Sequence, residues 1–408
     1  MKIFASSLLF ALLCINTTVT KAEISQSEID AYSHKMVSEK AQFIGYPVNQ
    51  NLDIKEFYSW FIDEGLTQLA MNNVGNPFSK SKYNLNTHRF ERDVIEFFAN
   101  KYNFKKDSYW GFITQSGTDG NNHGLYFARK HLESKSKKAP IIYVSADAHY
   151  SIIKLADVQN TELRVVKTDI MGRMDISDFN KKVDPKRPAI VVVAIGTTFK
   201  GAIDDHTKIL ASLKDHKMSD YYLHLDAALF GGYLPFLSDS NGIIDNARRY
   251  FDSISVSGHK FFGLDEPLGI FLMSKDKFQT IKPLRVEYLE EAIPTISCSR
   301  SAIGPMKIWW KIFKSNNANF TAQADFVLEN AKYLEQKMKE NGFKAYRNDH
   351  SNTVFFSSPA RSVIDKYSLA TEKDTDLGAL SHIVVMQHVT KEKLDTFVKD
   401  MVAARANK

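Results

Sequence analysis

Apolar, β-branched runs that alternate with helical stretches constrain the fold more than any other feature of this sequence. Four such runs follow one another in the middle of the chain, at residues 139–149, 188–198, 221–228 and 253–260. Continuous runs of Val and Ile are typical of strands that are buried on both faces of a mainly parallel sheet. Their alternation with helices predicts an α/β fold.

The C-terminal part of the chain has a different pattern, which predicts a second and smaller domain. It contains an apolar helix, a long amphipathic stretch, two strand-like segments and a closing helix, at 305–313, 321–341, 351–359, 382–389 and 391–404. This mixture indicates a small α+β domain. We therefore divide the chain into a leader, an N-terminal segment, a large domain and a small domain, at 1–22, 23–75, 76–300 and 301–408.

The first 22 residues have the pattern of a secretory signal peptide. Lys2 supplies a positive charge, residues 3–13 form an uncharged apolar run, and Ala22 is a small residue at the expected cleavage point. The apolar run is shorter than the roughly 20 residues that a membrane-spanning helix needs. We therefore expect a periplasmic or secreted protein with no membrane segment after signal removal. A signal anchor, or a cytoplasmic protein with a non-functional leader, is the alternative.

The composition excludes several function classes. A net charge of +6 is small for 408 residues, and the basic residues are interspersed with acidic ones, so nucleic-acid binding has little support. Cys14 lies in the leader and Cys298 is the only other cysteine. This excludes an intrachain disulfide and a cysteine-rich metal site from the mature chain, and we expect no metal.

Polar residues stand just after several predicted strands, where ligands bind in open α/β sheets. Lys260 follows a buried run, and a Schiff base with an aldehyde cofactor would remove the cost of its buried charge. Asp226 could hold a pyridine nitrogen protonated, and His149 could stack on the same ring. Each residue also has an ordinary alternative: a lysine that reaches solvent, a turn aspartate or a loop histidine.

The string 116–120 precedes an expected helix and predicts an anion site. Hydroxyls and free backbone N–H groups at a helix N-terminus bind phosphate, although a plain turn with a helix cap is the commoner meaning. Ser257 and His259 could add phosphate donors, and Thr198 could contact the ring or its phenolate oxygen. The order of these elements along the chain favours one cofactor, pyridoxal 5′-phosphate (PLP).

These motifs resemble those of the group II PLP-dependent amino acid decarboxylases, most of all the bacterial histidine decarboxylases, with the plant serine decarboxylases as near relatives. The strings that carry the resemblance are IGYP, SGTDGN, DAHYSIIK, IGTTFKGAIDD, DYYLHLDAAL, SVSGHK and SR, at 44–47, 116–121, 147–154, 195–205, 220–229, 255–260 and 299–300. The resemblance covers nearly all of the mature chain. It implies the aspartate aminotransferase type of PLP-dependent transferase fold (fold type I), and a homodimer with active sites at the subunit interface.

The resemblance also implies a role for each candidate residue. Lys260 would carry PLP as a Schiff base, Asp226 would pair with the pyridine nitrogen, and His149 would stack on the ring and contact the substrate. The implied phosphate ligands are Ser116, Gly117, Thr118 and Ser257. Tyr288 is the candidate donor of the proton that returns to Cα.

Three segments depart from the family pattern, in places where substrate specificity would be set: 116–119, 263–269 and 301–303. We expect decarboxylation of an L-amino acid to its amine and CO2, with histidine as the first candidate substrate. Serine, aspartate and aromatic amino acids are the alternatives. A PLP-dependent aminotransferase or lyase is also possible by sequence, because Arg300 could clamp a substrate carboxylate. A non-catalytic binding protein is the third hypothesis.

Overall fold

The computed structural model describes residues 24–240, 242–315 and 319–406. The chain divides into two compact units, Met1–Ala41 and Gln42–Lys408. In the first, helix α1 (Gln26–Glu39) begins with a capping box, in which the Ser25 N–H donates to the Glu28 carboxylate at 2.8 Å. None of its residues is buried, and the apolar side chains of Ile29, Tyr32 and Met36 are exposed along the helix. The predicted leader, 1–22, lies outside the described residues.

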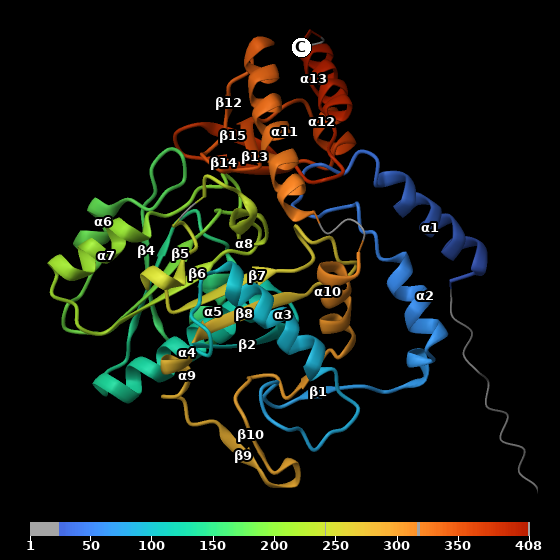
Figure 1. The fold of residues 1–408 in the computed structure, drawn as a ribbon. Coiled ribbons are helices and arrows are strands. Elements are labelled where there is room, and N and C mark those ends of the chain that lie inside the picture. The colour runs from blue at the N-terminus through green and yellow to red at the C-terminus, as the bar shows by residue number, and fades with distance from the viewer. Residues whose placement is uncertain (1–23, 241, 316–318, 407–408) are drawn as a thin grey trace, which may run out of the picture. The chain divides into compact units, whose positions relative to one another are not determined.

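A seven-stranded sheet forms the centre of the second unit (Figure 1). Its strands, in spatial order, are β2 (Tyr109–Thr114), β8 (Gly269–Ser274), β7 (Ser253–Ser257), β6 (Tyr221–Asp226), β5 (Ala189–Ala194), β3 (Ile141–Ser145) and β4 (Glu162–Val166). Strand β8 runs antiparallel to both of its neighbours, and the strands from β7 to β4 are all parallel. The predicted α/β fold with a mainly parallel sheet is confirmed.

Helices cover both faces of this sheet, which explains the continuous apolar runs. All six residues of β5 are buried. Ile190 belongs to the same apolar cluster as Leu125 of helix α4 (Gly117–Ser136), whereas Val191 belongs to the cluster of Ile209 in helix α7 (His206–Asp215). Successive side chains of a strand point to opposite faces, so a strand between two helical layers has no exposed face.

The small C-terminal domain is built on a four-stranded antiparallel sheet with the order β12-β13-β15-β14. Its strands are β12 (Ala345–Tyr346), β13 (Thr353–Ser357), β14 (Ala370–Asp374) and β15 (Gly378–Val384). Its helices are α11 (Phe320–Glu340), α12 (Arg361–Lys366) and α13 (Lys391–Ala406). Phe356 of β13 is in one apolar cluster with α11 and α13, whereas Phe355 clusters with Phe199 of the large domain. The small sheet thus packs on helices with one face and on the large domain with the other.

The remaining elements connect and flank these sheets (Figure 1). The helices are α2 (Lys55–Asp63), α3 (His88–Lys101), α5 (Ser151–Val158), α6 (Ile176–Lys182), α8 (Phe230–Tyr233), α9 (Lys275–Phe278) and α10 (Ile303–Phe313). Two short antiparallel pairs join β1 (Asn73–Val74) to β11 (Ser299–Arg300), and β9 (Leu284–Val286) to β10 (Glu291–Ile293). Within the described part of the chain, no helix combines the length and the apolar character needed to cross a membrane.

Candidate active site

A pocket of about 340 Å³ lies at the carboxyl ends of the parallel strands. Every sequence-predicted site residue except Tyr288 lines it: Ser116, Gly117, Thr118, His149, Thr198, Asp226, Ser257, His259 and Lys260. These residues come from four strand ends and from the start of α4, because parallel strands present their carboxyl ends at one edge of a sheet. The pocket is large enough for a cofactor-sized ligand.

Lys260 enters the pocket from the turn that follows β7. The turn is held from both sides, since the Lys260 carbonyl accepts hydrogen bonds from the N–H groups of Gly263 at 3.3 Å and Asn49 at 3.4 Å. Burial lowers the pKa of the Lys260 amine, and the carboxylate of Asp226 opposes this effect. A lysine with a lowered pKa has a larger neutral fraction, and only the neutral amine is a nucleophile.

Asp226 is the last residue of β6, and it is only 7% exposed. Its backbone is fixed in the sheet, where its carbonyl accepts a hydrogen bond from the Ile195 N–H at 2.9 Å. Its carboxylate interacts electrostatically with the Lys260 amine and the His149 ring, and it raises the pKa of both. A nearly buried carboxylate favours a cationic neighbour, so this position fits a cationic ligand group such as a protonated ring nitrogen.

His149 lies in the turn between β3 and α5, on another wall of the pocket. Its Nδ1 lies 2.7 Å from the Ser151 hydroxyl oxygen and 3.3 Å from the Ser151 backbone nitrogen, so the start of α5 holds the ring. Burial lowers the pKa of His149; Asp226 raises it, and Lys260 lowers it further. The imidazole is therefore neutral at pH 7 and can stack on a ring or exchange a proton with a ligand.

The start of α4 forms an anion site. The Ser116 side chain caps the helix by accepting a hydrogen bond from the Asp119 N–H at 3.1 Å, which leaves the N–H groups of Gly117 and Thr118 without intrahelical partners. The dipole of a helix of 20 residues favours negative charge at this end. A Cβ on Gly117 would lie 2.5 Å from the Ser257 Oγ, so only glycine allows the two phosphate-binding segments to approach this closely.

His259 also borders this anion site. Its Nδ1 lies 3.2 Å from the Leu268 carbonyl oxygen and 3.3 Å from the Leu268 N–H nitrogen. Burial lowers the pKa of His259; the Leu268 backbone raises it, and Lys260 lowers it. The ring is thus held by the backbone on one side and presents Nε2 as a further polar group beside Lys260.

Several pocket residues were not predicted from the sequence. Pro47 comes from the N-terminal segment, Pro267 from the segment after Lys260, and Thr353 and Val384 from the small domain. The string IGYP contains Pro47 and was a usable signal. Nothing in the sequence indicates that the ends of β13 and β15 reach the pocket, because their position depends on how the two domains pack.

Two residues with predicted or possible roles lie outside the pocket. Tyr288 stands between β9 and β10 and is 84% exposed, so its role as a proton donor stays a prediction. Arg300 is 4% exposed, pairs with the buried carboxylate of Glu91, and donates a hydrogen bond to the Gly75 carbonyl at 3.1 Å. The hypothesis that Arg300 clamps a substrate carboxylate is therefore wrong for the pocket of its own chain.

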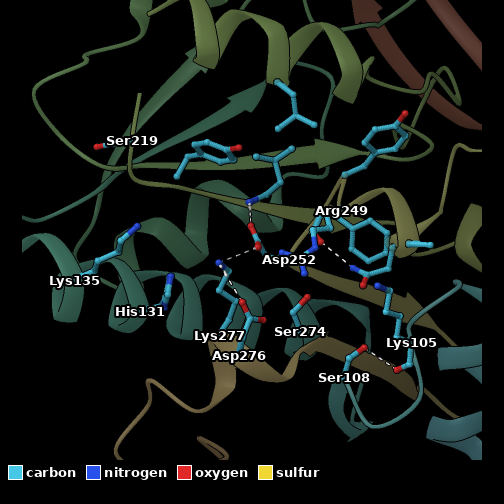
Figure 2. Close-up of a pocket in the computed structure, with 17 residues that line it drawn as sticks. Lys105, Ser108, His131, Lys135, Ser219, Arg249, Asp252, Ser274, Asp276 and Lys277 are labelled. Atoms are coloured by element: carbon cyan, nitrogen blue, oxygen red, sulfur yellow. Dashed lines mark hydrogen bonds and ion pairs between the residues drawn. The ribbon is translucent and has the colours of Figure 1, made fainter. Parts of the chain in front are cut away.

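A second cavity, of about 330 Å³, lies beside Asp252, which precedes β7, and Ser274, which ends β8 (Figure 2). This is the end of the sheet away from the carboxyl ends of the parallel strands. Two lysines that line this cavity form ion pairs with carboxylates. Lys277 lies 3.7 Å from both Asp252 and Asp276, and Lys135 lies 2.8 Å from Asp220. Burial raises the pKa of Asp252 to about 6. None of the predicted site residues lines this cavity. The pocket around Lys260 is therefore the candidate active site.

Comparisons with known proteins agree with this assignment. The family model of the pyridoxal-dependent decarboxylase conserved domain matches residues 127–358. Histidine decarboxylase of Solanum lycopersicum is 34% identical, over 94% of this chain and 91% of that protein. Serine decarboxylase 1 of Oryza sativa subsp. japonica is 33% identical, over 93% of this chain and 76% of that protein. Histidine decarboxylase of Morganella morganii is 31% identical, over 93% of this chain and 96% of that protein.

Solved structures show the same fold. L-methionine decarboxylase from Streptomyces sp. 590 has a TM-score of 0.81 at 21% identity, with 93% of this chain and 95% of that chain covered. Glutamate decarboxylase of Lactobacillus brevis CGMCC 1306 has a TM-score of 0.78 at 18% identity, with 100% and 96% covered. The predicted fold type I of the PLP-dependent enzymes is confirmed.

Proposed function

Because the chain belongs to the pyridoxal-dependent decarboxylase family, we propose that it converts L-histidine to histamine and CO2. The bond between Cα and the carboxylate carbon breaks, CO2 leaves, and a proton is added to Cα. Relatives named histidine decarboxylase, from a plant and from a bacterium, cover more than nine-tenths of this chain and support histidine as the substrate. Serine is the second candidate, because a serine decarboxylase is 33% identical.

The single observation that carries the decarboxylase chemistry is the meeting of Lys260, Asp226 and His149 in one pocket. Bound PLP supplies a ring that accepts the electron pair released when the bond to the carboxylate breaks. Lys260 would hold the cofactor covalently through its amine, and Asp226 would keep a proton on the ring nitrogen. The free N–H groups at the start of α4 would bind the phosphate, and Ser257 would add a hydroxyl.

The surroundings of the pocket favour loss of the carboxylate over amino transfer. Among the described residues that line it, none is an arginine, and Lys260 is the only lysine. A substrate carboxylate would therefore lie beside uncharged groups such as Tyr150 and Thr353, with few donors to stabilise its charge. A poorly stabilised carboxylate is lost more readily, since CO2 is neutral.

We extend the proposal to a homodimer in which Tyr288 of one protomer donates the proton to Cα in the other. Two observations support it: Tyr288 is exposed and does not line its own pocket, and α1 carries exposed apolar side chains that a second protomer would cover. Hybrid dimers of Lys260→Ala and Tyr288→Phe chains test the idea. If Tyr288 acts across the interface, mixing the two weak variants restores one complete site per dimer. If it acts within its own chain, mixing restores nothing.

We also propose that residues 1–22 direct export, so that the mature protein is periplasmic or secreted. The basis is the charged start, the short apolar run and the small residue at position 22. Expression of the full chain followed by N-terminal sequencing tests this. A mature N-terminus close to residue 23 in the exported fraction is expected, and an intact Met1 in the cytoplasm would contradict the proposal.

The substrate proposal is tested by direct product analysis. The PLP-loaded protein is incubated with an equimolar mixture of the twenty amino acids, and the amines are identified by mass spectrometry. Histamine should be the main product, with release of one CO2 per amine and no need for a keto acid. Ethanolamine as the main product would assign serine instead, and a requirement for a keto acid would indicate amino transfer. Lys260→Ala serves as the control for activity from contaminants.

A further inference from the structure

A buried lysine outside the pocket joins the segments that carry the pocket residues. Lys200 follows β5 and is 4% exposed, yet it does not line the pocket. Its Nζ lies 2.7 Å from the Asp374 carboxylate and 3.4 Å from the Asp147 carboxylate. A buried charge persists only where partners compensate it, so these contacts must be kept in the folded protein.

The three charged residues belong to three segments that meet at the pocket. Asp147 stands two residues before His149, and its carboxylate also accepts a hydrogen bond from the Thr168 hydroxyl at 2.8 Å. Lys200 stands two residues after Thr198, and Asp374 ends β14 of the small domain. One ammonium group therefore links the turn of His149, the loop of Thr198 and the small domain.

Backbone contacts hold the Lys200 segment against the small domain as well. The Lys200 carbonyl accepts a hydrogen bond from the Asn348 amide at 3.0 Å. The Phe199 carbonyl oxygen lies 2.8 Å from the His382 Nδ1, and the rings of Phe199 and His382 stack with centroids 4.4 Å apart. These contacts hold the segment of Phe199 and Lys200 without the Lys200 ammonium, whose ion pairs with Asp147 and Asp374 therefore act on the neighbouring His149 turn.

The charges around Lys200 explain why its ammonium matters. Burial alone would lower the pKa of Lys200, but Asp374 and Asp147 outweigh burial and raise it. A further carboxylate, Glu372, faces the same cluster, and burial and Asp147 raise its pKa. Without the ammonium, three carboxylates would face one another in a partly buried site and would drive the segments apart.

We propose that Lys200 is a positioning residue of the PLP pocket, which holds His149 on the pocket wall by locking the turn of Asp147 and His149 to the small domain. The inference rests on the pocket being the PLP site, as proposed above. It is independent of which amino acid is decarboxylated.

The experiment compares Lys200→Met with Lys200→Arg and with a matched control, Lys182→Met. Lys182 also lies 2.7 Å from a carboxylate, that of Asp178, but outside the pocket. For each purified full-length variant, PLP affinity is measured by titration, together with the visible absorption of bound PLP, kcat, KM and the thermal midpoint. PLP affinity and absorption need no substrate, so they report on Lys200 even if histidine is not turned over.

Lys200→Met should weaken PLP binding by about ten-fold or more and change the absorption of the bound cofactor. It should also lower kcat more than it raises KM, because a small displacement of a positioned group costs up to about a hundred-fold in rate. Lys200→Arg should restore most of the loss, and Lys182→Met should leave PLP affinity and absorption unchanged. The proposal is overturned if Lys200→Met and Lys182→Met both bind PLP as the wild type does. If Lys200→Met does not fold, Asp374→Asn replaces it, and unchanged PLP binding in that variant also overturns the proposal.

Discussion

Among single residues, Asp226 shows how the site is prepared for a cationic ligand group. Its carboxylate is nearly buried and lies in the same pocket as Lys260, whose pKa it raises. Its backbone cannot move away, because β6 is paired on both sides, with β5 and with β7. The chain therefore holds a nearly buried negative charge in place, where it can compensate a cationic group.

Asp226→Asn should consequently lower both the activity of the protein and its stability without PLP. The amide has the same shape but cannot hold a proton on a ring nitrogen by charge, so kcat should fall by about a hundred-fold or more. Without PLP, the free energy of unfolding should fall, by up to about 1–3 kcal/mol, because the carboxylate that compensates the buried Lys260 amine is gone. CO2 release and urea unfolding measure the two effects. Asp220→Asn makes the same change at a half-buried residue just before β6, outside the pocket, and should leave kcat unchanged; a normal kcat in Asp226→Asn would contradict the assigned role.

At the level of elements, β6 and α4 together align the two ends of the cofactor site. Residues two apart on a strand share a face, so His224 and Asp226 both point to the α4 side of the sheet. The His224 Nε2 lies 3.0 Å from the Asn121 side-chain oxygen of α4, and its Nδ1 lies 2.7 Å from the Ser253 hydroxyl of β7. A Cβ on Gly124 of α4 would lie 2.3 Å from the His224 ring, so the helix sits directly on it. This contact sets the distance between the start of α4 and Asp226.

The buried His224 should make the stability of the protein depend on pH. Burial lowers the pKa of His224 to about 3, whereas an unfolded histidine has a pKa of about 6.5. Between these values the unfolded chain binds one more proton at this position, so stability falls as pH falls, by about 1.4 kcal/mol per pH unit. His224→Gln should remove this part of the slope between about pH 6 and pH 4. Urea unfolding at several pH values measures it, with the exposed His34→Gln as the control, and an unchanged slope in His224→Gln would disprove the assignment.

At the scale of the whole molecule, the pocket wall combines three parts of the chain. Pro47 comes from the N-terminal segment, Lys260 from the large domain, and Thr353 and Val384 from the small domain. A ligand that contacts all of them binds only when the domains are packed together. Ligand binding is thereby linked to the folding of the whole second unit.

Addition of PLP should raise the stability of the protein as a whole. At a free concentration of a hundred times Kd, a ligand that binds only the folded state adds about 2.7 kcal/mol. Lys260→Ala should gain less from the same concentration, because the covalent link is lost. Pyridoxine 5′-phosphate, which has no aldehyde, provides the comparison: it should stabilise both proteins equally. Thermal unfolding with and without each ligand measures these gains, and equal gains from PLP in both proteins would argue against Lys260 as the attachment point.

The sequence predicts the large domain well because each of its strands can be recognised from the residues of that strand alone. Val191 and its neighbours form an apolar run that is typical of a strand covered on both faces. Asp226 ends such a run, and Lys260 stands three residues after another. Strand β14, with the sequence ATEKD, was not predicted, since its polar residues carry no strand pattern. The burial of Arg300 could not be predicted from the sequence either, because its partner Glu91 is 209 positions away along the chain.

The contribution of Val384 to the pocket has a consequence for biosynthesis. A ribosome adds residues in order, and β15 must pair with both β13 and β14 before Val384 reaches its place. A nascent chain that already contains Lys260 still lacks Thr353 and Val384, which line the cavity from the small domain. We therefore expect the chain to capture the cofactor only after β15 has been made.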